Sequence, residues 1–209
     1  MKTNLTTTSL SLALVHYPTV NKQGAKVCTS VTNLDIHDIA RTCRTFGFKH
    51  YFLVTPLQLQ TELIARILNY WETDKAGAYN PDRFDALSIA KVVPSLEAAR
   101  DYVTQSEGKS PILAATGANF LKAGQNVEVN APSEYIAKCQ EQASPGLVVF
   151  GTGYGLHAEA LELCDLRLAP ILGHANDGYN HLSVRSAAAL YAFLLTERSL
   201  LNSKGEKVL

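Results

Sequence analysis

The sequence predicts a single α/β domain, in which a mainly parallel sheet is flanked by helices on both faces. Short apolar runs recur along the chain and are bounded by Gly, Pro or Asn, as buried strands are. Amphipathic helical patterns separate these runs, which is typical of a parallel sheet covered on both sides. The 209 residues, 46% of them apolar, suffice for one hydrophobic core. We therefore expect one domain over residues 1–209, with its core at about residues 10–200.

Six apolar segments are predicted as strands. They are Leu10–Val15, Tyr51–Val54, Leu87–Val93, Ile112–Ala115, Leu147–Phe150 and Leu166–Ile171. The first is not a signal peptide, because only Lys2 precedes it as a charge and no small-residue cleavage site follows it. No run approaches the about 18 apolar residues that span a bilayer. We expect a soluble, cytoplasmic protein.

Helices are predicted between and after these strands. They are Asp35–Phe46, Leu57–Trp71, Ser95–Gln105, Pro132–Ala143, His157–Cys164 and His181–Leu200. The second of them has an apolar face made of Leu59, Leu63, Ile67 and Tyr70. Residues Thr73–Phe84 contain Gly77 and Pro81 and are predicted as the longest loop, and the polar tail after Asn202 is predicted to fray.

Charge and cysteine content restrict the function classes. Lys plus Arg and Asp plus Glu both number 19, so any contact with RNA must use a local basic patch. Only 18% of residues are charged, below the usual value of about a quarter, which suggests a surface covered by a second copy in a homodimer. The cysteines show neither a disulfide nor a zinc pattern and are predicted as small buried thiols. They are Cys28, Cys43, Cys139 and Cys164.

Glycines cluster directly after the strongest predicted strand, at Gly151, Gly153 and Gly155. Ligands of open parallel sheets bind beyond the carboxyl ends of strands, where glycine lets the backbone approach them closely. The G-x-G-x-G spacing late in the chain differs from the early G-x-G-x-x-G of dinucleotide-binding folds. A turn without a ligand and a nucleotide-dependent oxidoreductase both remain as alternatives.

Two polar segments are further candidates. Residues 173–183 form a polar loop before a helix start, where backbone amide protons are free, although an ordinary N-cap explains them equally well. His37 and Arg41 lie one turn apart on a polar helix face, for which a solvated, salt-bridged face is the alternative. A structural role is predicted for three histidines without ligand-like spacing, His16, His50 and His157.

Taken together, these segments resemble the three motifs of the SPOUT RNA methyltransferases, which bind S-adenosylmethionine (SAM) in a deep trefoil knot. Residues 35–43 look like the first motif, residues 147–156 like the second and residues 182–189 like the third. His16-Tyr17-Pro18 and residues 32–41 and 179–187 further resemble a bacterial subfamily whose members occur alone or fused to a tRNA guanine methyltransferase. The likeness runs from about Leu10 to Leu195.

The resemblance implies a SPOUT fold with its knot at about residues 111–190 and a homodimer with active sites at the subunit interface. The residues implied to bind SAM are Ala115, Thr116, Gly117, Gly151, Thr152, Gly153, Tyr154, Gly155, Ile171, Leu172, Gly173, His181, Leu182 and Ser183. Arg41, Ser183 and His37 are implied as catalytic, and Asn33, Asp38 and Arg185 as substrate-binding. No metal is required.

In SPOUT ribose methyltransferases the first-motif Arg, here Arg41, engages the target 2′-hydroxyl and its phosphate. A guanidinium with a pKa above about 12 is a poor base, so we expect Arg41 to position the target and stabilise charge. Two positions depart from the motifs: Gly153 replaces a frequent Glu and Asp35 replaces an Asn. The missing polar groups could come from His37, Asp38, His181 or Arg185, with His181 the best candidate for titration near neutral pH.

We therefore expect a SAM-dependent methyltransferase that acts on RNA, with tRNA as the expected substrate and a ribose 2′-hydroxyl as the acceptor. Guanine ring nitrogen is the second acceptor. The alternative from another class is a SAM-binding module without chemistry of its own, which the neutral charge and the missing Glu favour. The RNA species, the modified position and the need for a partner protein stay open at this stage.

Overall fold

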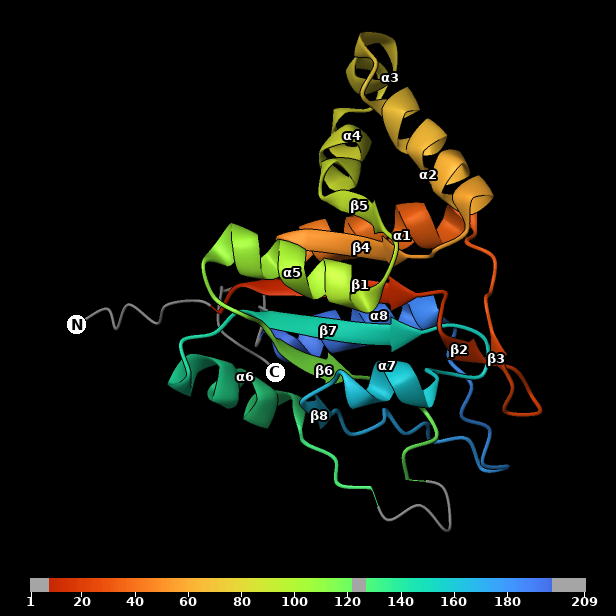
Figure 1. Cartoon of the computed structure of the whole chain (residues 1–209), viewed down its shortest axis with the longest axis vertical. Coiled ribbons are helices and arrows are strands. Elements are labelled where there is room, and N and C mark those ends of the chain that lie inside the picture. The colour runs from red at the N-terminus through yellow and green to blue at the C-terminus, as the bar shows by residue number, and fades with distance from the viewer. Residues whose placement is uncertain (1–7, 122–126, 197–209) are drawn as a thin grey trace.

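A six-stranded parallel sheet forms the centre of the protein (Figure 1). The structure is a computed structural model that describes residues 8–121 and 127–196. The strands are β1 (Leu10–Val15), β2 (Thr19–Val20), β3 (Lys26–Val27), β4 (His50–Val54), β5 (Ala90–Val93), β6 (Ile112–Ala115), β7 (Gly146–Gly151) and β8 (Leu166–Arg167). The helices are α1 (Asn33–Thr45), α2 (Gln58–Trp71), α3 (Asp74–Tyr79), α4 (Pro81–Ser88), α5 (Leu96–Glu107), α6 (Pro132–Glu141), α7 (Ala158–Glu162) and α8 (Val184–Leu195).

Helices cover both faces of this sheet, as predicted. The strand order is β5-β4-β1-β7-β6-β8, and every pairing in the sheet is parallel. Leu12 and Leu14 of β1 belong to the core shared with α1, α6 and α8, whereas Ala13 and Val15 belong to the core shared with α5 and α7. This alternation is the period-two pattern of a strand that is buried on both sides.

The direction in which the chain winds along the sheet reverses between β1 and β7. From β1 the chain continues to α1 on one face, and from β7 it continues to α7 on the opposite face. In open parallel sheets such a switch point leaves a crevice at the carboxyl ends of the two strands. Val15 at the end of β1 pairs with Gly151 at the end of β7, so the loops that follow these residues border that crevice.

The first helix begins two residues earlier than predicted. Thr32 is its N-cap: the Thr32 hydroxyl accepts the Asp35 backbone N–H, and the Asp35 carboxylate accepts the Thr32 backbone N–H. This reciprocal capping box satisfies two amide groups that the first turn leaves free. It therefore places Asp35 inside the helix rather than at its start.

The prediction for residues 73–89 was wrong. The predicted loop Thr73–Phe84 is mostly helical, and the predicted strand Leu87–Val93 begins only at Ala90, because α4 occupies its first part. Asn80 caps α4 by accepting the backbone N–H of Arg83 at 3.0 Å, and Pro81 occupies the first turn. Asn followed by Pro fits a helix start as well as a turn, and the helix start is what forms.

The helices α2, α3 and α4 project from the β5 edge of the sheet (Figure 1). The apolar face predicted for α2 is largely exposed, since Leu59 is 81% accessible and Leu63 and Tyr70 are also exposed. The residues of α2 that reach the core are the buried Ile64 and the partly buried Ile67, Leu68 and Trp71, so Ile67 alone of the predicted face does so. Helical periodicity located the helix but did not identify the side that the core covers.

Several predicted elements end earlier than expected. Strand β8 stops at Arg167 instead of Ile171, because its partner β6 ends at Ala115. The helices α6, α7 and α8 are also shorter than predicted, while the predicted end of the last helix at Leu200 lies outside the described residues, as does the tail after Asn202. The knot predicted for residues 111–190 stays a prediction, and residues 122–126 within it are not described.

Two smaller observations concern the cysteines and the membrane. Cys43 and Cys139 are buried as predicted, whereas Cys28 and Cys164 are only partly buried, which corrects the prediction for those two. None of the helices in the described part of the chain has the length and apolar character to cross a bilayer.

Candidate functional site

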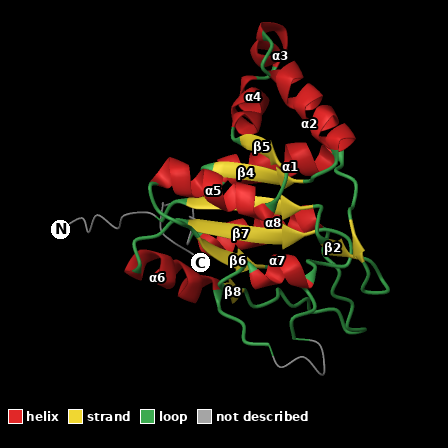
Figure 2. Cartoon of the chain, viewed as in Figure 1, coloured by secondary structure: helices red, strands yellow, loops and turns green. Residues whose placement is uncertain are grey.

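A cavity of about 670 Å³ opens at the carboxyl edge of the sheet. Loops that follow the strands gather at this edge (Figure 2), and the start of α8 completes the wall. The predicted ligand residues that line the cavity are Thr116, Gly117, Gly151, Thr152, Gly153, Tyr154, Gly155, Ile171, His181, Leu182 and Ser183. Three other predicted residues, Ala115, Leu172 and Gly173, are not part of the lining. The fold therefore brings together segments that are separated by more than sixty residues in the sequence.

The glycine loop after β7 is tight because of its own backbone. A Cβ on Gly151 would lie 2.7 Å from the backbone nitrogen of Leu156. Gly153 and Gly155 have φ angles of +62° and +116°, which side chains disfavour. The Gly155 backbone N–H donates to the Thr152 carbonyl at 3.0 Å and closes the turn. Glycine at these positions is thus required for the loop to fold over the strand end.

A short hairpin fixes the outer side of the glycine loop. Val20 in β2 donates its backbone N–H to the Gly155 carbonyl at 3.0 Å and accepts the Tyr154 N–H at 3.1 Å. β2 itself pairs with β3 in an antiparallel hairpin. The segment between β1 and α1 therefore acts as a brace for the cavity wall.

A histidine forms part of the cavity floor. His16 follows β1 directly and is 1% exposed. Its Nδ1 lies 3.1 Å from the Thr29 hydroxyl, and that hydroxyl is hydrogen-bonded to the hydroxyl of Thr152 in the glycine loop. Its Nε2 is buried and has no hydrogen-bond partner among residues 8–121 and 127–196. Burial lowers the pKa of His16 to about 4, against the opposing effect of the Asp35 carboxylate, so the ring is neutral at physiological pH.

An ion-pair cluster joins the starts of α1 and α8. Asp35 lines the cavity and is 5% exposed, and one of its oxygens accepts from Arg185 at 3.2 Å. The Nε of Arg185 lies 3.4 Å from Asp38. Arg185 and Asp38, both predicted as substrate-binding, thus contact each other within the chain. The cluster fixes the relative position of the two helix starts.

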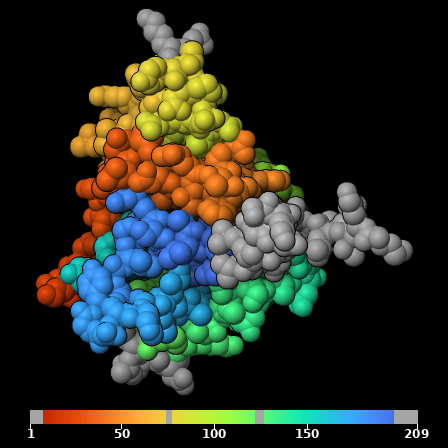
Figure 3. All heavy atoms as spheres, turned by 180° about the vertical axis from the view of Figure 1, so that it is seen from behind, coloured from red at the N-terminus to blue at the C-terminus, as the bar shows by residue number. Residues whose placement is uncertain are grey.

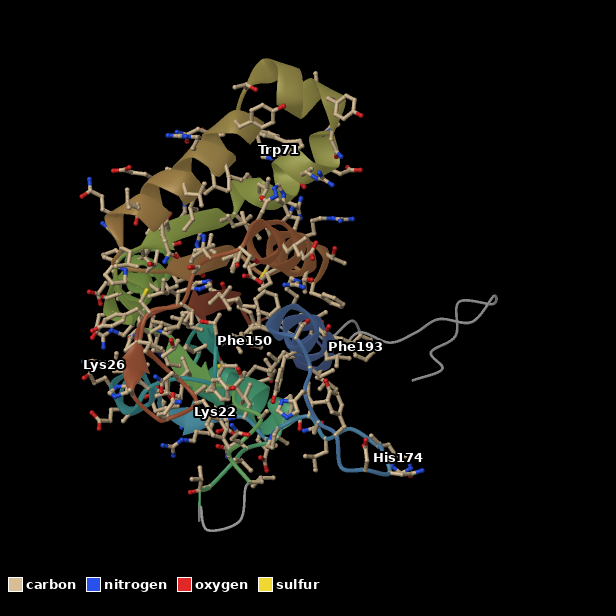
Figure 4. All side chains as sticks on the ribbon, turned by 90° about the vertical axis from the view of Figure 1, so that its right-hand side faces the viewer. Lys22, Lys26, Trp71, Phe150, His174 and Phe193 are labelled. Carbon is tan, nitrogen blue, oxygen red and sulfur yellow. The ribbon has the colours of Figure 1, made fainter. Side chains whose placement is uncertain are left out.

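The start of α8 borders the cavity. Ser183 is the N-cap, and its hydroxyl accepts the Ser186 backbone N–H at 3.1 Å. The side chain of Asn180 bridges the preceding loop, donating to the Ile171 carbonyl and accepting the Gly173 N–H. His174, on the same loop, projects away from Phe150 at the centre of the molecule (Figure 4). The loop is braced near the cavity and extends into solvent beyond it.

Four predicted residues of α1 lie outside the cavity of their own chain, namely Asn33, His37, Asp38 and Arg41. Arg41 and Asn33 are exposed, and His37 packs against Trp71 with ring centroids 5.8 Å apart. Burial, followed by the charge of Arg83, lowers the pKa of His37. Any contribution of these residues to the chemistry must therefore come from a second copy of the chain or from a ligand that extends beyond the cavity.

The charges of the lining indicate which ligands the cavity suits. Among the described residues that line it, Asp35 is the only carboxylate, and there is no Lys or Arg. A cationic ligand fits this lining better than a pyrophosphate, which argues against the dinucleotide alternative. In the described part of the chain, no three His, Cys, Asp or Glu side chains are grouped as metal ligands.

Sequence reasoning missed seven polar lining residues, which are His16, Thr29, Ser30, Asp35, Asn119, Asn180 and Tyr191. His16 was predicted to be structural because it lacks ligand-like spacing. Its position directly after the first strand was the available signal, because the switch point lies at that strand end.

Comparison with known proteins identifies one family of RNA methyltransferases. A family model described as "SAM-dependent RNA methyltransferase" matches residues 9–195. A protein of Nitratidesulfovibrio vulgaris named tRNA (guanine-N(1)-)-methyltransferase is 42% identical over 182 residues, which are 87% of this chain and 40% of that protein. An uncharacterized protein of Aquifex aeolicus is 33% identical over 188 residues, 90% of this chain and 88% of its own length. The chain thus spans about two fifths of the first relative.

Solved structures share the fold at low sequence identity. A probable methyltransferase from Bordetella pertussis Tohama I has a TM-score of 0.58 at 21% identity, covering 91% of this chain and 95% of its own. The SpoU methyltransferase AviRb from Streptomyces viridochromogenes, in complex with AdoMet, has a TM-score of 0.52 at 16% identity, covering 91% and 57%. The TrmH/SpoU tRNA modifying enzyme of A. aeolicus has a TM-score of 0.51 at 14% identity, covering 95% and 83%. The sheet and its flanking helices therefore have the SPOUT arrangement.

Proposed function

This chain belongs to the family of SAM-dependent RNA methyltransferases, and we propose on this basis that the cavity at the carboxyl edge of its sheet is the SAM site. Bound SAM supplies a methyl group activated by a sulfonium. Membership of the family supports an enzyme over a SAM-binding module without chemistry. We also propose that residues 1–209 form one SPOUT-like domain that contains the predicted knot.

The lining supports the assignment of the cavity to SAM. The glycine loop presents backbone where a Cβ would not fit, and Asp35 provides a negative charge for a cationic cofactor. Thr116, Tyr154 and the start of α8 at Ser183 would hold the remaining parts of the cofactor.

The proposed RNA substrate is tRNA. The observation that carries this proposal is the 42% identity to a protein named as a tRNA methyltransferase, over 87% of this chain. Because that relative is more than twice as long, its activity is carried over here only as a proposal. A tRNA substrate also implies a cytoplasmic location, which we propose.

The proposed methyl acceptor is a ribose 2′-hydroxyl, on the strength of the first-motif arginine at Arg41. Guanine N1 is the second candidate, because two relatives at 42% and 41% identity are named as guanine-N(1) methyltransferases. The contribution of the protein to catalysis is then mainly to hold the acceptor atom of the RNA in line with the methyl carbon of SAM and to exclude water.

Tritium transfer from SAM to tRNA, followed by mass spectrometry of the nucleosides, tests both parts of the proposal. The tRNA is taken from a strain that lacks the gene. We expect label in tRNA and a single new 2′-O-methylated nucleoside. Label in 1-methylguanosine would favour the second acceptor, and label confined to another RNA class would contradict the tRNA proposal.

The proposed active form is a homodimer with its sites at the subunit interface. Arg41 lies outside the cavity of its own chain, so a second copy is the simplest source of it. After its first turn the helix α8 is composed of apolar residues and Tyr191, yet Leu190 and Leu194 are 42% and 45% exposed. Figure 3 shows α8 on the face behind the sheet, next to α1. An apolar helix face left in solvent is typical of a covered interface.

Charge on the outer side of α8 is expected to break this dimer. The double variant Leu190→Glu and Leu194→Glu should convert the protein to a monomer in light scattering coupled to gel filtration, because two carboxylates would be buried without partners. The same substitution at exposed Leu59 of α2 is the matched control and should leave the mass unchanged. A dimer that survives the double substitution would place the interface elsewhere.

A further inference from the structure

The geometry points to His16 as the group that accepts the proton which the methyl acceptor releases. This inference rests on the proposed function and adds a residue that the methyltransferase motifs do not contain. It starts from the position of His16 at the switch point of the sheet. Val15 pairs with Gly151, so His16 and the glycine loop leave the sheet side by side and both line the cavity.

Hydrogen-bond counting assigns the tautomer of His16. The Thr152 hydroxyl donates to the Val15 carbonyl at 3.0 Å, and it therefore accepts the hydroxyl proton of Thr29. A hydroxyl has one proton. Because Thr29 has given its proton to Thr152, the remaining contact at 3.1 Å requires Nδ1–H of His16 as the donor.

This chain of donors leaves Nε2 of His16 without a proton. In the opposite direction, with Thr29 donating to His16, the single proton of Thr152 could serve either the Val15 carbonyl or the Thr29 hydroxyl, and the other contact would have no proton. The first arrangement satisfies all three of these contacts, and the one it leaves without a proton is the longer contact between the Thr29 hydroxyl and the His16 carbonyl, at 3.4 Å. A buried lone pair thus remains on a residue of the cavity lining, with no partner among the described residues. Such a nitrogen is a ready acceptor for an O–H or N–H group of a ligand.

The other groups of the lining are less suited to take a proton. One carboxylate oxygen of Asp35 is bonded to Arg185 and the other to Thr32. The hydroxyl of Tyr191 donates to the Ala169 carbonyl at 2.7 Å. His181 and Tyr154 are exposed to solvent. His16 is the buried base of the described lining whose lone pair is free.

The chemistry of methyl transfer requires such a base. A bond forms between the acceptor atom and the methyl carbon, and the carbon–sulfur bond breaks with its electron pair staying on sulfur. The acceptor O–H or N–H loses its proton, which His16 takes at Nε2 to become an imidazolium. The positive charge leaves sulfur as it arrives at His16, so the net charge within the cavity does not change.

The surroundings of His16 fit both states of the ring. Burial keeps the pKa of His16 at about 4 and hence the ring unprotonated before transfer, and a cationic cofactor nearby would favour the neutral ring further. The Asp35 carboxylate opposes this shift and would stabilise the imidazolium afterwards. The strand partners of β1 at this point, Val54 and Gly151, carry no charge.

The first test measures the tautomer in the free protein by ¹⁵N–¹H NMR of the histidine rings. We expect Nδ1–H and a bare Nε2 for His16. His157 is the internal reference, because its Nδ1 accepts the Glu159 backbone N–H at 3.3 Å and must therefore show the opposite tautomer. A proton on Nε2 of His16 would overturn the inference without any assay of activity.

The second test compares His16→Gln with the wild type at saturating SAM and tRNA. Single-turnover methyl transfer should fall by about 100-fold or more, the usual contribution of a general base. SAM affinity by calorimetry should stay within about threefold. His50→Gln, a half-buried histidine bonded to Ser106 away from the cavity, is the matched control and should be unaffected.

The pH dependence separates proton transfer from a merely structural role. The His16→Gln rate should rise with pH as hydroxide replaces the missing base, whereas the wild-type rate should be flat between neutral and mildly alkaline pH. The charged groups that bear on His16 are Asp35 and its ion-pair partner Arg185, and neither is altered. A rate loss independent of pH, or one matched by the loss of SAM affinity, would overturn the inference.

A milder variant keeps the inference testable if His16→Gln does not fold. Thr29→Val preserves shape but removes the acceptor of Nδ1–H, so the tautomer should shift and transfer should fall by about tenfold. An unchanged tautomer and rate in Thr29→Val would contradict the hydrogen-bond chain. If wild-type protein methylates no tRNA, the substrate proposal fails, while the tautomer measurement still decides on His16.

Discussion

Gly151→Ala is expected to weaken SAM binding by up to about 150-fold, so that methyl transfer is lost at SAM concentrations near the wild-type Kd. The new Cβ would meet the backbone nitrogen of Leu156 at 2.7 Å and the carbonyl carbon of Gly155 at 2.9 Å. Backbone atoms cannot rotate away, so the whole loop must shift. Overpacking of this kind costs about 1–3 kcal/mol, equivalent to about 5- to 150-fold in affinity. Calorimetric titration with SAM measures the loss.

Thermal unfolding of the same variant shows whether only the loop is affected. Gly77→Ala is the matched control, since its Cβ would make ordinary contacts of 3.7 Å or more with its neighbours. We expect the control to bind SAM normally and to lose no stability. Normal SAM affinity in Gly151→Ala would mean that the cofactor is held elsewhere in the protein.

The strands show how far the sequence predicts this fold. Leu10–Val15 and Ile112–Ala115 form the strands that were predicted, because apolar runs between polar or turn residues are specific for buried parallel strands. The prediction for residues 73–89 failed because Asn80-Pro81 is compatible with both a turn and a helix start. The choice between them depends on packing against α1 and α2, which local sequence does not contain.

Only part of the site was predicted from the sequence, because some of its contacts depend on three-dimensional packing. The glycine loop and the start of α8 lie in recognisable motifs, so most of their residues line the cavity as expected. His16 could not be found by spacing, because its environment is created by Thr29 and Thr152, the latter more than a hundred residues away in the sequence. A protonation state set by such contacts becomes visible only in three dimensions.

Arg185 is a residue that a motif selected but that has another contact in the structure. Its position in the third motif predicted a contact with substrate, and the structure pairs it with Asp35 and Asp38. Two carboxylates next to one guanidinium leave little free charge for an RNA phosphate. In the described chain Arg185 therefore aligns α1 with α8. This alignment matters for catalysis if α1 supplies Arg41 to a neighbouring subunit.

Arg41→Ala is expected to retain SAM affinity and to lose methyl transfer by about 100- to 1,000-fold, the usual effect of removing one charge-stabilising donor. SAM affinity should persist because Arg41 does not line the cavity of its own chain. Arg44→Ala is the matched control on the same helix: this exposed side chain pairs with Asp85 at 2.7 Å, and such surface pairs contribute little. Calorimetry and single-turnover transfer measure the two quantities separately.

Mixed dimers then test from which subunit Arg41 acts. A protomer with Arg41→Ala keeps its SAM cavity, and a protomer with Gly151→Ala keeps its Arg41. If Arg41 acts across the interface, random mixing of the two inactive variants should restore about one quarter of wild-type activity, because half of the dimers are mixed and each has one complete site. If Arg41 instead acts within its own chain, the mixture stays inactive, because each protomer then lacks one of the two required parts.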